Sequence, residues 1–276
     1  MSAPTVRLRL FDTGYCRVAA GHVLRGAPAT PMDCHALVGL IEHPTRGFLL
    51  WDVGYAPRLH AALRPWPFLL YRWATPLHLD PQLAVVAQLA RMGINSADIG
   101  HVIVSHFHAD HIAGLRDFPA ATIVAAADAL DRVIGVEGLL ALRLAYVPTL
   151  LPADFADRVQ PIYRFTGPLV APFGPSHDLF GDGSLLLVRL PGHARGQLGL
   201  FLPTASVFLA ADGAWLNQAI REQRGPGRVG YLIADDPRAL DATLAKLHTF
   251  ALANPDVTMI PTHCPEVYAR VQRGEL

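Results

Sequence analysis

The pattern of hydrophobic and polar residues predicts a chain of short strands and helices. Short apolar runs bounded by turn residues are typical of buried strands, and they occur at 36–41, 48–53, 101–105, 122–124, 185–190, 198–202, 206–210 and 257–260. Apolar residues recur at helical spacing from Asp80-Pro81 to Gly93 and from Asp236-Pro237 to Asn254-Pro255. Because strands and helices mix, with runs of strands toward both ends, the pattern favours a layered fold of both over an all-helical or all-β one.

One stretch departs from this pattern. Residues 56–79 hold four aromatic side chains among prolines and show no clean period. We interpret the stretch as an irregular insertion or lid within a single domain that spans residues 1–276. Its aromatic residues, Phe68 and Trp73 among them, could form a hydrophobic wall for an acyl or aryl group, or they could pack in a core or a dimer contact.

Composition excludes several classes of protein. Of 276 residues, 51% are hydrophobic and 17% are charged, and 23 basic residues balance 23 acidic ones. A disordered chain would have the opposite character, and the absence of a basic excess argues against a nucleic-acid partner. The high apolar fraction indicates a large core, an apolar pocket or a homodimer face.

The cysteines and the apolar stretches indicate in which cellular compartment the protein is expected. The three cysteines are odd in number and form no CxxC pair, so a disulfide framework is not expected and a reducing compartment fits better. The first residues lack the apolar segment of a signal peptide, and the apolar stretch 66–77 is too short to span a bilayer. We therefore expect a cytoplasmic protein with no membrane partner.

Four potential metal ligands lie within six residues, directly after the predicted strand 101–105. They are His106, His108, Asp110 and His111. In an extended chain, the two histidines of an H-x-H sequence lie on the same side, and loops at strand ends are where such folds place ligand chemistry. Imidazoles together with a carboxylate suit Zn²⁺ or a similar metal, not Ca²⁺ or Mg²⁺.

Three later strands end in the same way. Each delivers one ligand-type residue beside Gly, Pro or Thr, and these residues are His193, Asp212 and His263. Five histidines and two aspartates exceed the needs of one tetrahedral site. They suit two adjacent metal ions that share a bridging carboxylate.

This H-x-H-x-D-H motif with later His, Asp and His resembles the metallo-β-lactamase superfamily of binuclear metallohydrolases. The resemblance runs from Asp52-Val53-Gly54, similar to the family's D-x-G turn, to His263. It implies an α+β fold, an αββα sandwich with the metals at one edge. By the same resemblance, His106, His108 and His193 would bind one ion, Asp110, His111 and His263 would bind the other, and Asp212 would bridge them.

Such a pair of ions predicts hydrolysis. Two metals lower the pKa of a bridging water, which gives a hydroxide nucleophile at neutral pH, and Asp110 is the expected catalytic group that orients it and carries its proton. Zn²⁺ is the expected ion, and Mn²⁺, Co²⁺ or Fe²⁺ would also accept this ligand set.

Within the superfamily, the chain looks most like the N-acyl homoserine lactonases of quorum quenching. Residues 190–198 resemble their T-P-G-H-x-x-G-H stretch, although Gln197 replaces its second His. The lactonases carry a Tyr three residues after the bridging Asp, and here Trp215 holds that position as a candidate substrate contact. Phe107, inside the motif, is expected to pack beneath the metals, and its alternative role is a contact with substrate.

Three functions remain open from the sequence. The first is a hydrolase of lactones, N-acyl homoserine lactones above all. The second is a related hydrolase of aryl esters or phosphotriesters. The presence of Trp215 in place of the lactonase Tyr is an argument for this second function. The third is a ligand-binding regulator that keeps the fold and the metals but has little turnover. In each case the expected partner is a small molecule.

Overall fold

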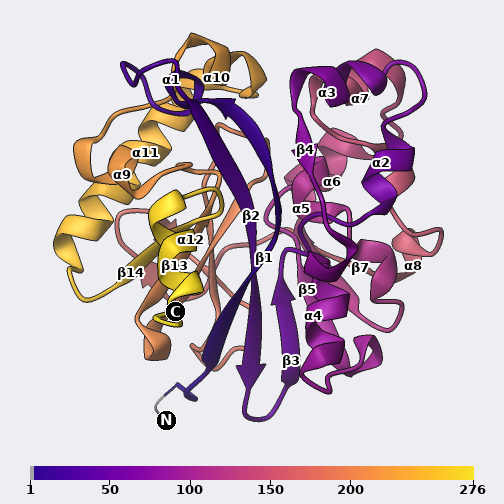
Figure 1. Ribbon diagram of the computed structural model, residues 1–276. Coiled ribbons are helices and arrows are strands. Elements are labelled where there is room, and N and C mark those ends of the chain that lie inside the picture. The colour runs from indigo at the N-terminus through magenta and orange to yellow at the C-terminus, as the bar shows by residue number, and fades with distance from the viewer. Residues whose placement is uncertain (1–2) are drawn as a thin grey trace.

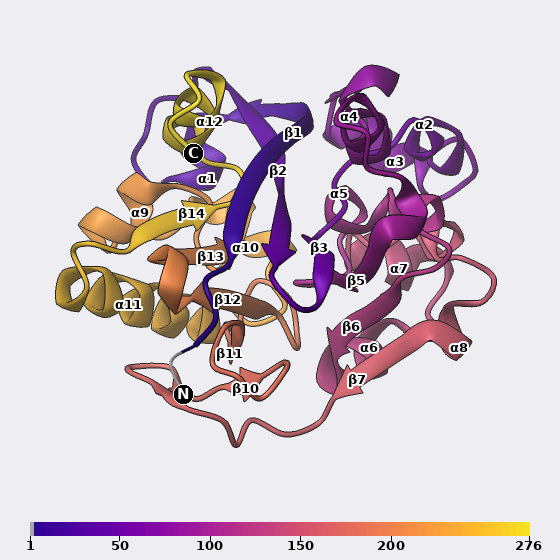
Figure 2. The ribbon, with the colours of Figure 1, turned by 90° about the horizontal axis from the view of Figure 1, so that it is seen from below.

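Two β-sheets face each other and helices cover their outer faces, in a computed structural model that describes residues 3–276 (Figure 1, Figure 2). The larger sheet has the order β4-β1-β2-β3-β5-β6-β7. Its strands are β1 (Arg7–Ala19), β2 (Pro31–His43), β3 (Gly47–Trp51), β4 (Leu77–His78), β5 (Ile99–Ile103), β6 (Thr122–Ala126) and β7 (Val159–Ile162). This is the αββα sandwich of the α+β class that was expected.

The second sheet has the order β10-β11-β12-β13-β14. Its strands are β10 (His177–Asp178), β11 (Leu186–Arg189), β12 (Leu198–Leu202), β13 (Val207–Ala211) and β14 (Thr258–Pro261). A short pair, β8 (Leu169–Val170) and β9 (Gly174–Pro175), lies apart from both. Strands β3, β5, β6 and β7 run parallel, as do β13 and β14, whereas the remaining neighbours are antiparallel.

Helices α2 to α8 lie on the outer side of the larger sheet, and α9 and α11 lie on the side of the smaller one (Figure 2). Helix α12 packs against β1 and β2. The helices are α1 (Ala20–Val23), α2 (Arg58–Ala62), α3 (Leu69–Ala74), α4 (Val85–Arg91), α5 (Ala109–Ile112), α6 (Ala127–Val133), α7 (Gly138–Arg143), α8 (Phe155–Arg158), α9 (Asn217–Glu222), α10 (Arg228–Ile233), α11 (Pro237–Ala253) and α12 (Pro265–Gln272). Within residues 3–276, no helix combines the length and apolar character needed to cross a membrane.

Each strand predicted from an apolar run is present, and seven of the eight have ends that differ by two residues or fewer. The exception is β2, which begins at Pro31, five residues before the predicted start at residue 36. Strand β3 stops at Trp51 rather than at residue 53, because Asp52 adopts a left-handed backbone with φ of 55°. Strand β1 is the main element that the pattern does not predict. Its centre holds Asp12, Thr13 and Gly14, which look like a turn, and the pairing with β2 shifts its register there.

The two helices predicted from Asp-Pro starts differ in outcome. Helix α11 matches its prediction, and the Asp236 carboxylate accepts hydrogen bonds from the backbone N–H groups of Arg238 and Ala239. The first helix is interrupted: a 3₁₀ turn at Pro81–Leu83 precedes α4, and Ala84 between them is not helical. The apolar residues at helical spacing in this segment are divided between the 3₁₀ turn and α4, and do not form one continuous helix.

The segment 56–79 is more regular than its composition indicates. It contains α2, α3 and the two-residue strand β4. Helices of five and six residues are too short to display an amphipathic period, which is why the sequence pattern reads as irregular there. Through β4, which pairs with β1 at Tyr15 and Cys16, the segment is tied to the edge of the larger sheet.

Candidate metal centre

The residues of the H-x-H-x-D-H motif lie where β5 meets α5. His108 precedes the first turn of α5, which carries Asp110 and His111. The Asp52 backbone N–H donates to the carbonyl of Ile103, and that of Val53 donates to the carbonyl of His111. The ends of two parallel strands are thus joined, and the motif is held against β3.

The other strand ends converge on the same place. His193 follows β11, and its position depends on Gly192, which has φ of +131°. A Cβ on Gly192 would lie 2.1 Å from the backbone nitrogen of Leu240 in α11, so only glycine fits. Asp212 follows β13 and His263 follows β14, on neighbouring parallel strands.

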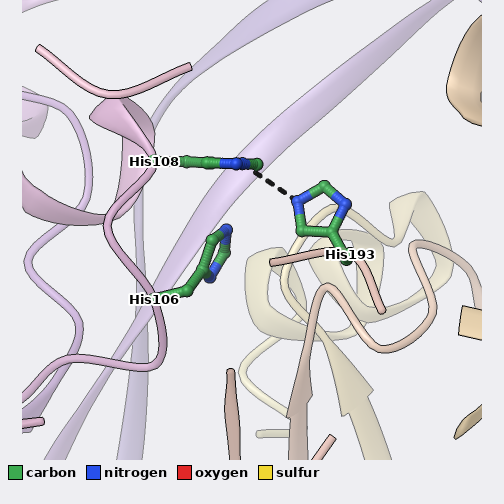
Figure 3. Close-up of side chains that lie close together, drawn as sticks. All are labelled: His106, His108 and His193. Atoms are coloured by element: carbon green, nitrogen blue, oxygen red, sulfur yellow. Dashed lines mark hydrogen bonds between the residues drawn. The ribbon is translucent and has the colours of Figure 1, made fainter. Parts of the chain in front are cut away.

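Three histidines form the first potential ligand group. The Nε2 atom of His193 lies 3.0 Å from the Nδ1 atom of His108, and His106 points toward both rings (Figure 3). One ligand atom from each of His106, His108 and His193 falls within 4.8 Å of the others. The three side chains are buried, which keeps competing water away from the group.

A second group consists of Asp110, His111 and His263, whose ligand atoms also lie within 4.8 Å of one another. The Oδ2 atom of Asp110 is 3.4 Å from Nε2 of His263 and 3.9 Å from Nε2 of His111. Asp212 lies between the two groups: its Oδ2 atom is 3.2 Å from Nε2 of both His193 and His263. The structure therefore brings all seven predicted ligands together, while the role of each stays a prediction.

Hydrogen bonds behind the site orient the imidazoles. The carboxylate of Asp52 accepts from the backbone and the hydroxyl of Ser105, and its Oδ2 atom is 2.8 Å from Nδ1 of His111. Nδ1 of His263 donates to the carbonyl of His35 at 2.7 Å. Each contact uses Nδ1 and leaves Nε2 facing the site, which is the usual way in which a protein fixes a metal-ligating histidine.

Several buried polar atoms of the site have no hydrogen-bond partner within residues 3–276. Besides Nδ1 of His193, they are Nε2 of His106, Nε2 of His111 and Oδ1 of Asp212. Leaving such an atom unpaired costs roughly 1–3 kcal/mol, so native folds seldom tolerate three together without a reason. A cation would satisfy all three, and the residues present therefore fit a metal site.

The pKa values separate the two groups. Burial lowers the pKa of His193 to about 3, and it lowers those of His106 and His108 as well. Burial also opposes charge on His263, but the carboxylates of Asp212 and Asp110 outweigh it and raise its pKa to about 9. Those two carboxylates and Asp52 likewise raise the pKa of His111 against the effect of burial.

A cavity of about 400 Å³ opens onto these ligands. Asp110, His108, His193, Asp212 and His263 form its polar floor, and its wall is largely apolar. The wall residues are Cys16, Val18, His22, Val23, Cys34, Tyr55, Leu70, Tyr71, Ala74, Thr75, Leu142, Arg143, Ala145, Trp215, Val229, Gly230 and Ile233.

Of the four side chains predicted to contact substrate, Trp215 lines this cavity and three do not. Phe107 is buried against Tyr146 and Phe155 below the motif. Phe68 packs on the core, and Trp73 is 70% exposed. Phe107 is thus packed in the core below the motif, as its main expectation stated, whereas Phe68 and Trp73 lie outside the cavity because α3 turns other residues of the segment inward.

The side chains that α3 turns toward the cavity are Leu70, Tyr71 and Ala74. The sequence pattern does not single out Tyr71 among the aromatic residues of this segment, since six residues do not reveal which face of a helix is buried. The D-x-G turn predicts a backbone feature at Asp52, and the structure adds its contact with His111. The D-x-G pattern could have marked it, because a buried aspartate after a strand needs a partner.

The fold and this cluster define a metal-dependent hydrolase. The chain belongs to the metallo-beta-lactamase superfamily, whose family model matches residues 32–247.

Curated relatives carry related names. "Metallo-hydrolase mfmC" of Annulohypoxylon moriforme is 28% identical over 231 residues, which is 76% of this chain and 57% of that protein, so this chain spans little more than half of its length. "N-acyl homoserine lactonase AttM" of Rhizobium radiobacter is 26% identical over 202 residues, which is 71% of this chain and 70% of that one.

Solved structures share the fold. An N-acyl homoserine lactone hydrolase, with N-hexanoyl-L-homoserine bound at its catalytic metal centre, superposes with a TM-score of 0.73 at 17% identity, covering 98% of this chain and 96% of that one. AidC, a dizinc quorum-quenching lactonase, gives 0.67 at 16% identity, covering 96% and 90%.

Metal affinity should depend on pH differently in the two groups. His111 and His263 carry protons at neutral pH, so an ion at the Asp110 group must displace them, and its affinity should rise about tenfold per pH unit for each proton displaced. The three-histidine group is already deprotonated, so its affinity should change little between about pH 6 and pH 8. Zinc titrations against a competing chelator would measure both phases, and equal pH slopes would contradict the assignment.

Replacing Asp52 by Asn should weaken metal binding without removing a ligand. The carboxylate accepts from the Ser105 backbone N–H through Oδ1 and from the Ser105 hydroxyl and His111 through Oδ2. An amide has only one acceptor oxygen, so its NH2 group must face one of these donors, and the imidazole loses its fixed orientation. We expect about a 10- to 100-fold loss of zinc affinity in chelator competition. Asp182→Asn is the matched control, because Asp182 contacts His43 away from the site and should leave the affinity unchanged.

Proposed function

We propose that the protein is a dinuclear metal-dependent hydrolase that opens lactone rings, with N-acyl homoserine lactones as its substrate class. The observation that carries the proposal is the carboxylate of Asp212, whose Oδ2 atom lies 3.2 Å from a histidine of each ligand group. A carboxylate shared in this way suits two adjacent ions. Similarity to the AttM lactonase over 71% of this chain supports the choice of substrate.

His106, His108 and His193 would hold one ion, Asp110, His111 and His263 the other, and Asp212 both. Zn²⁺ fits the mixture of imidazole and carboxylate, and Mn²⁺, Co²⁺ or Fe²⁺ are alternatives. When bound, such a pair of ions supplies an acidified water and polarises a carbonyl oxygen.

Asp110 is the residue proposed to handle the proton of the reaction. Its carboxylate lines the cavity and is 13% exposed, so it can reach a bound substrate. In this role it orients the attacking water, accepts its proton and returns that proton to the alkoxide released when the ring opens. His263, 3.4 Å from its Oδ2 atom, holds the carboxylate in place.

Trp215 has a supporting role in this scheme. Its indole Nε1–H donates to Oδ2 of Asp212 at 2.8 Å, so the donor is directed at the shared carboxylate and not at the substrate. The indole ring also packs edge-on against His193. Trp215 would therefore orient Asp212, and another group must donate a hydrogen bond to the substrate carbonyl.

Tyr71 is the proposed donor to that carbonyl. Its side chain is half-buried in the cavity wall, and no other residue in 3–276 engages its hydroxyl in a hydrogen bond. Burial, and then the negative charge of Asp110, raise the pKa of Tyr71 well above its usual value. The phenol therefore stays protonated at neutral pH and can donate a hydrogen bond.

The apolar wall accounts for the acyl part of the substrate. Leu70, Leu142, Val229 and Ile233 surround the polar floor in a cavity of about 400 Å³. Burying an acyl chain there contributes about 0.8 kcal/mol for each methylene group removed from water. The lactone carbonyl would then lie over Asp110 and Asp212.

A substrate panel with metal analysis tests the proposal. We expect two divalent ions per chain and turnover of N-acyl homoserine lactones of several acyl lengths, with Asp212→Ala losing both metal and activity. Simple lactones, aryl esters and phosphotriesters complete the panel. Hydrolysis of triesters without any lactone would favour the related esterase or triesterase, and tight ligand binding without turnover would favour a regulator.

Replacing Tyr71 by Phe separates its hydroxyl from its packing. Loss of the donor should lower kcat by about tenfold or more, because a hydrogen bond to the developing negative charge is removed. Metal content should stay the same, since Tyr71 is not a ligand. The control is Tyr163→Phe, at a tyrosine that is 72% exposed and outside the cavity. Unchanged kinetics in Tyr71→Phe would remove Tyr71 from the mechanism.

A further inference from the structure

Two of the three cysteines face each other across neighbouring strands in the wall of the cavity. Cys16 on β1 and Cys34 on β2 are direct partners in the antiparallel register. These two strands run side by side through the middle of the molecule (Figure 1). Both thiols line the cavity that holds Asp110 and His263. The structure therefore places a dithiol, and not two isolated cysteines, beside the candidate metal centre.

The backbone geometry suits a bond between the two sulfur atoms. Directly opposed residues of an antiparallel pair have Cα atoms about 4.5–5.5 Å apart. A disulfide requires a Cα separation of about 4.4–6.8 Å. No strand movement is needed to bring this pair into range, so oxidation can proceed within the native fold.

The two thiols also differ in reactivity. A hydrogen bond from the partner thiol lowers the pKa of Cys16, whereas the same contact and burial raise the pKa of Cys34. Cys16 is the more exposed of the two, at 8% against 4%. A reagent in the cavity reaches the more exposed thiol first, so Cys16 is placed to react before Cys34.

The third cysteine is separate from this pair. Cys264 is the N-cap residue that precedes α12, and its Sγ atom accepts from the backbone N–H of Asn217 at 3.3 Å. It is buried and does not line the cavity. Cys264 can therefore serve as an internal reference for any reagent that enters the cavity.

We propose that Cys16 and Cys34 form a reversible disulfide in the cavity wall when a hydroperoxide enters. The Cys16 thiolate attacks one peroxide oxygen, the O–O bond breaks, and the products are a Cys16 sulfenic acid and hydroxide or alkoxide. The Cys34 thiolate then attacks the sulfenic sulfur, forming the S–S bond and releasing hydroxide, which its displaced proton converts to water. Two thiols are oxidised and one hydroperoxide is reduced to water and an alcohol or a second water.

The disulfide would change the part of the cavity wall that is connected to α3 through β4. Cys16 also pairs with Leu77 of β4, the strand that follows α3 and its cavity residues Leu70 and Tyr71. A cross-link between β1 and β2 at this point stiffens the wall to which the α3 segment is attached. Its effect on turnover rests on the proposed function, but the formation of the bond does not.

Hydrogen peroxide applied to the zinc-loaded protein tests the proposal. After denaturation, thiol counting should give one free thiol per chain in place of three, and the mass should fall by about 2 Da. Peptide mapping should find the Cys16–Cys34 cross-link, and dithiothreitol should restore all three thiols. These readouts need no turnover, so a failed disulfide and a failed hydrolase assignment remain distinguishable.

Matched variants make the outcome specific. Cys264→Ser should still form the disulfide, leaving no free thiol, whereas Cys16→Ser and Cys34→Ser should not form it within the chain. A stable sulfinic acid on Cys16 with Cys34 still reduced would overturn the proposal. So would a cross-link to Cys264 or between two chains, or three thiols that persist after peroxide treatment.

Discussion

Buried charge at the carboxyl ends of the strands is the constraint on which the site depends. Asp212 lies among the imidazoles of His111, His193 and His263, which hold the pKa of its carboxyl well below its usual range against the opposing effect of burial. Negative charge that has been removed from water needs positive charge or hydrogen bonds nearby. The strand ends satisfy this need by bringing histidines from three separate segments to one carboxylate.

Bringing these side chains together constrains the backbone conformation behind the candidate ligands. Gly192 passes so close to α11 that a side chain has no room, and Asp52 takes a left-handed backbone to reach both Ser105 and His111. The first feature precedes His193 in the chain, and the second contacts His111. The site is thus preorganised by residues that are not themselves ligands.

The wall and the floor of the cavity are built from different structural elements. The floor is polar and comes from strand ends, whereas the wall comes from short helices and from the paired strands β1 and β2. Short helices such as α3 are stabilised by packing and not by helix propensity, so small shifts there alter the wall while the floor stays in place. The apolar wall and the polar floor of the cavity are therefore built by separate parts of the fold.

The sequence by itself predicted the seven candidate ligands that the fold brings together, and most strands of both sheets. Residue type and short spacing settle these features: H-x-H-x-D-H needs only its own six residues, and an apolar run indicates a strand wherever it lies. The sequence did not determine strand β1, whose centre resembles a turn, nor the partner of His111, which is 59 residues away. It also did not reveal that Trp215 turns its indole N–H to Asp212, that Tyr71 and not Trp73 faces the cavity, or that Cys16 lies opposite Cys34. Only the tertiary structure decided these contacts, because they depend on strand order, register and the buried face of a six-residue helix.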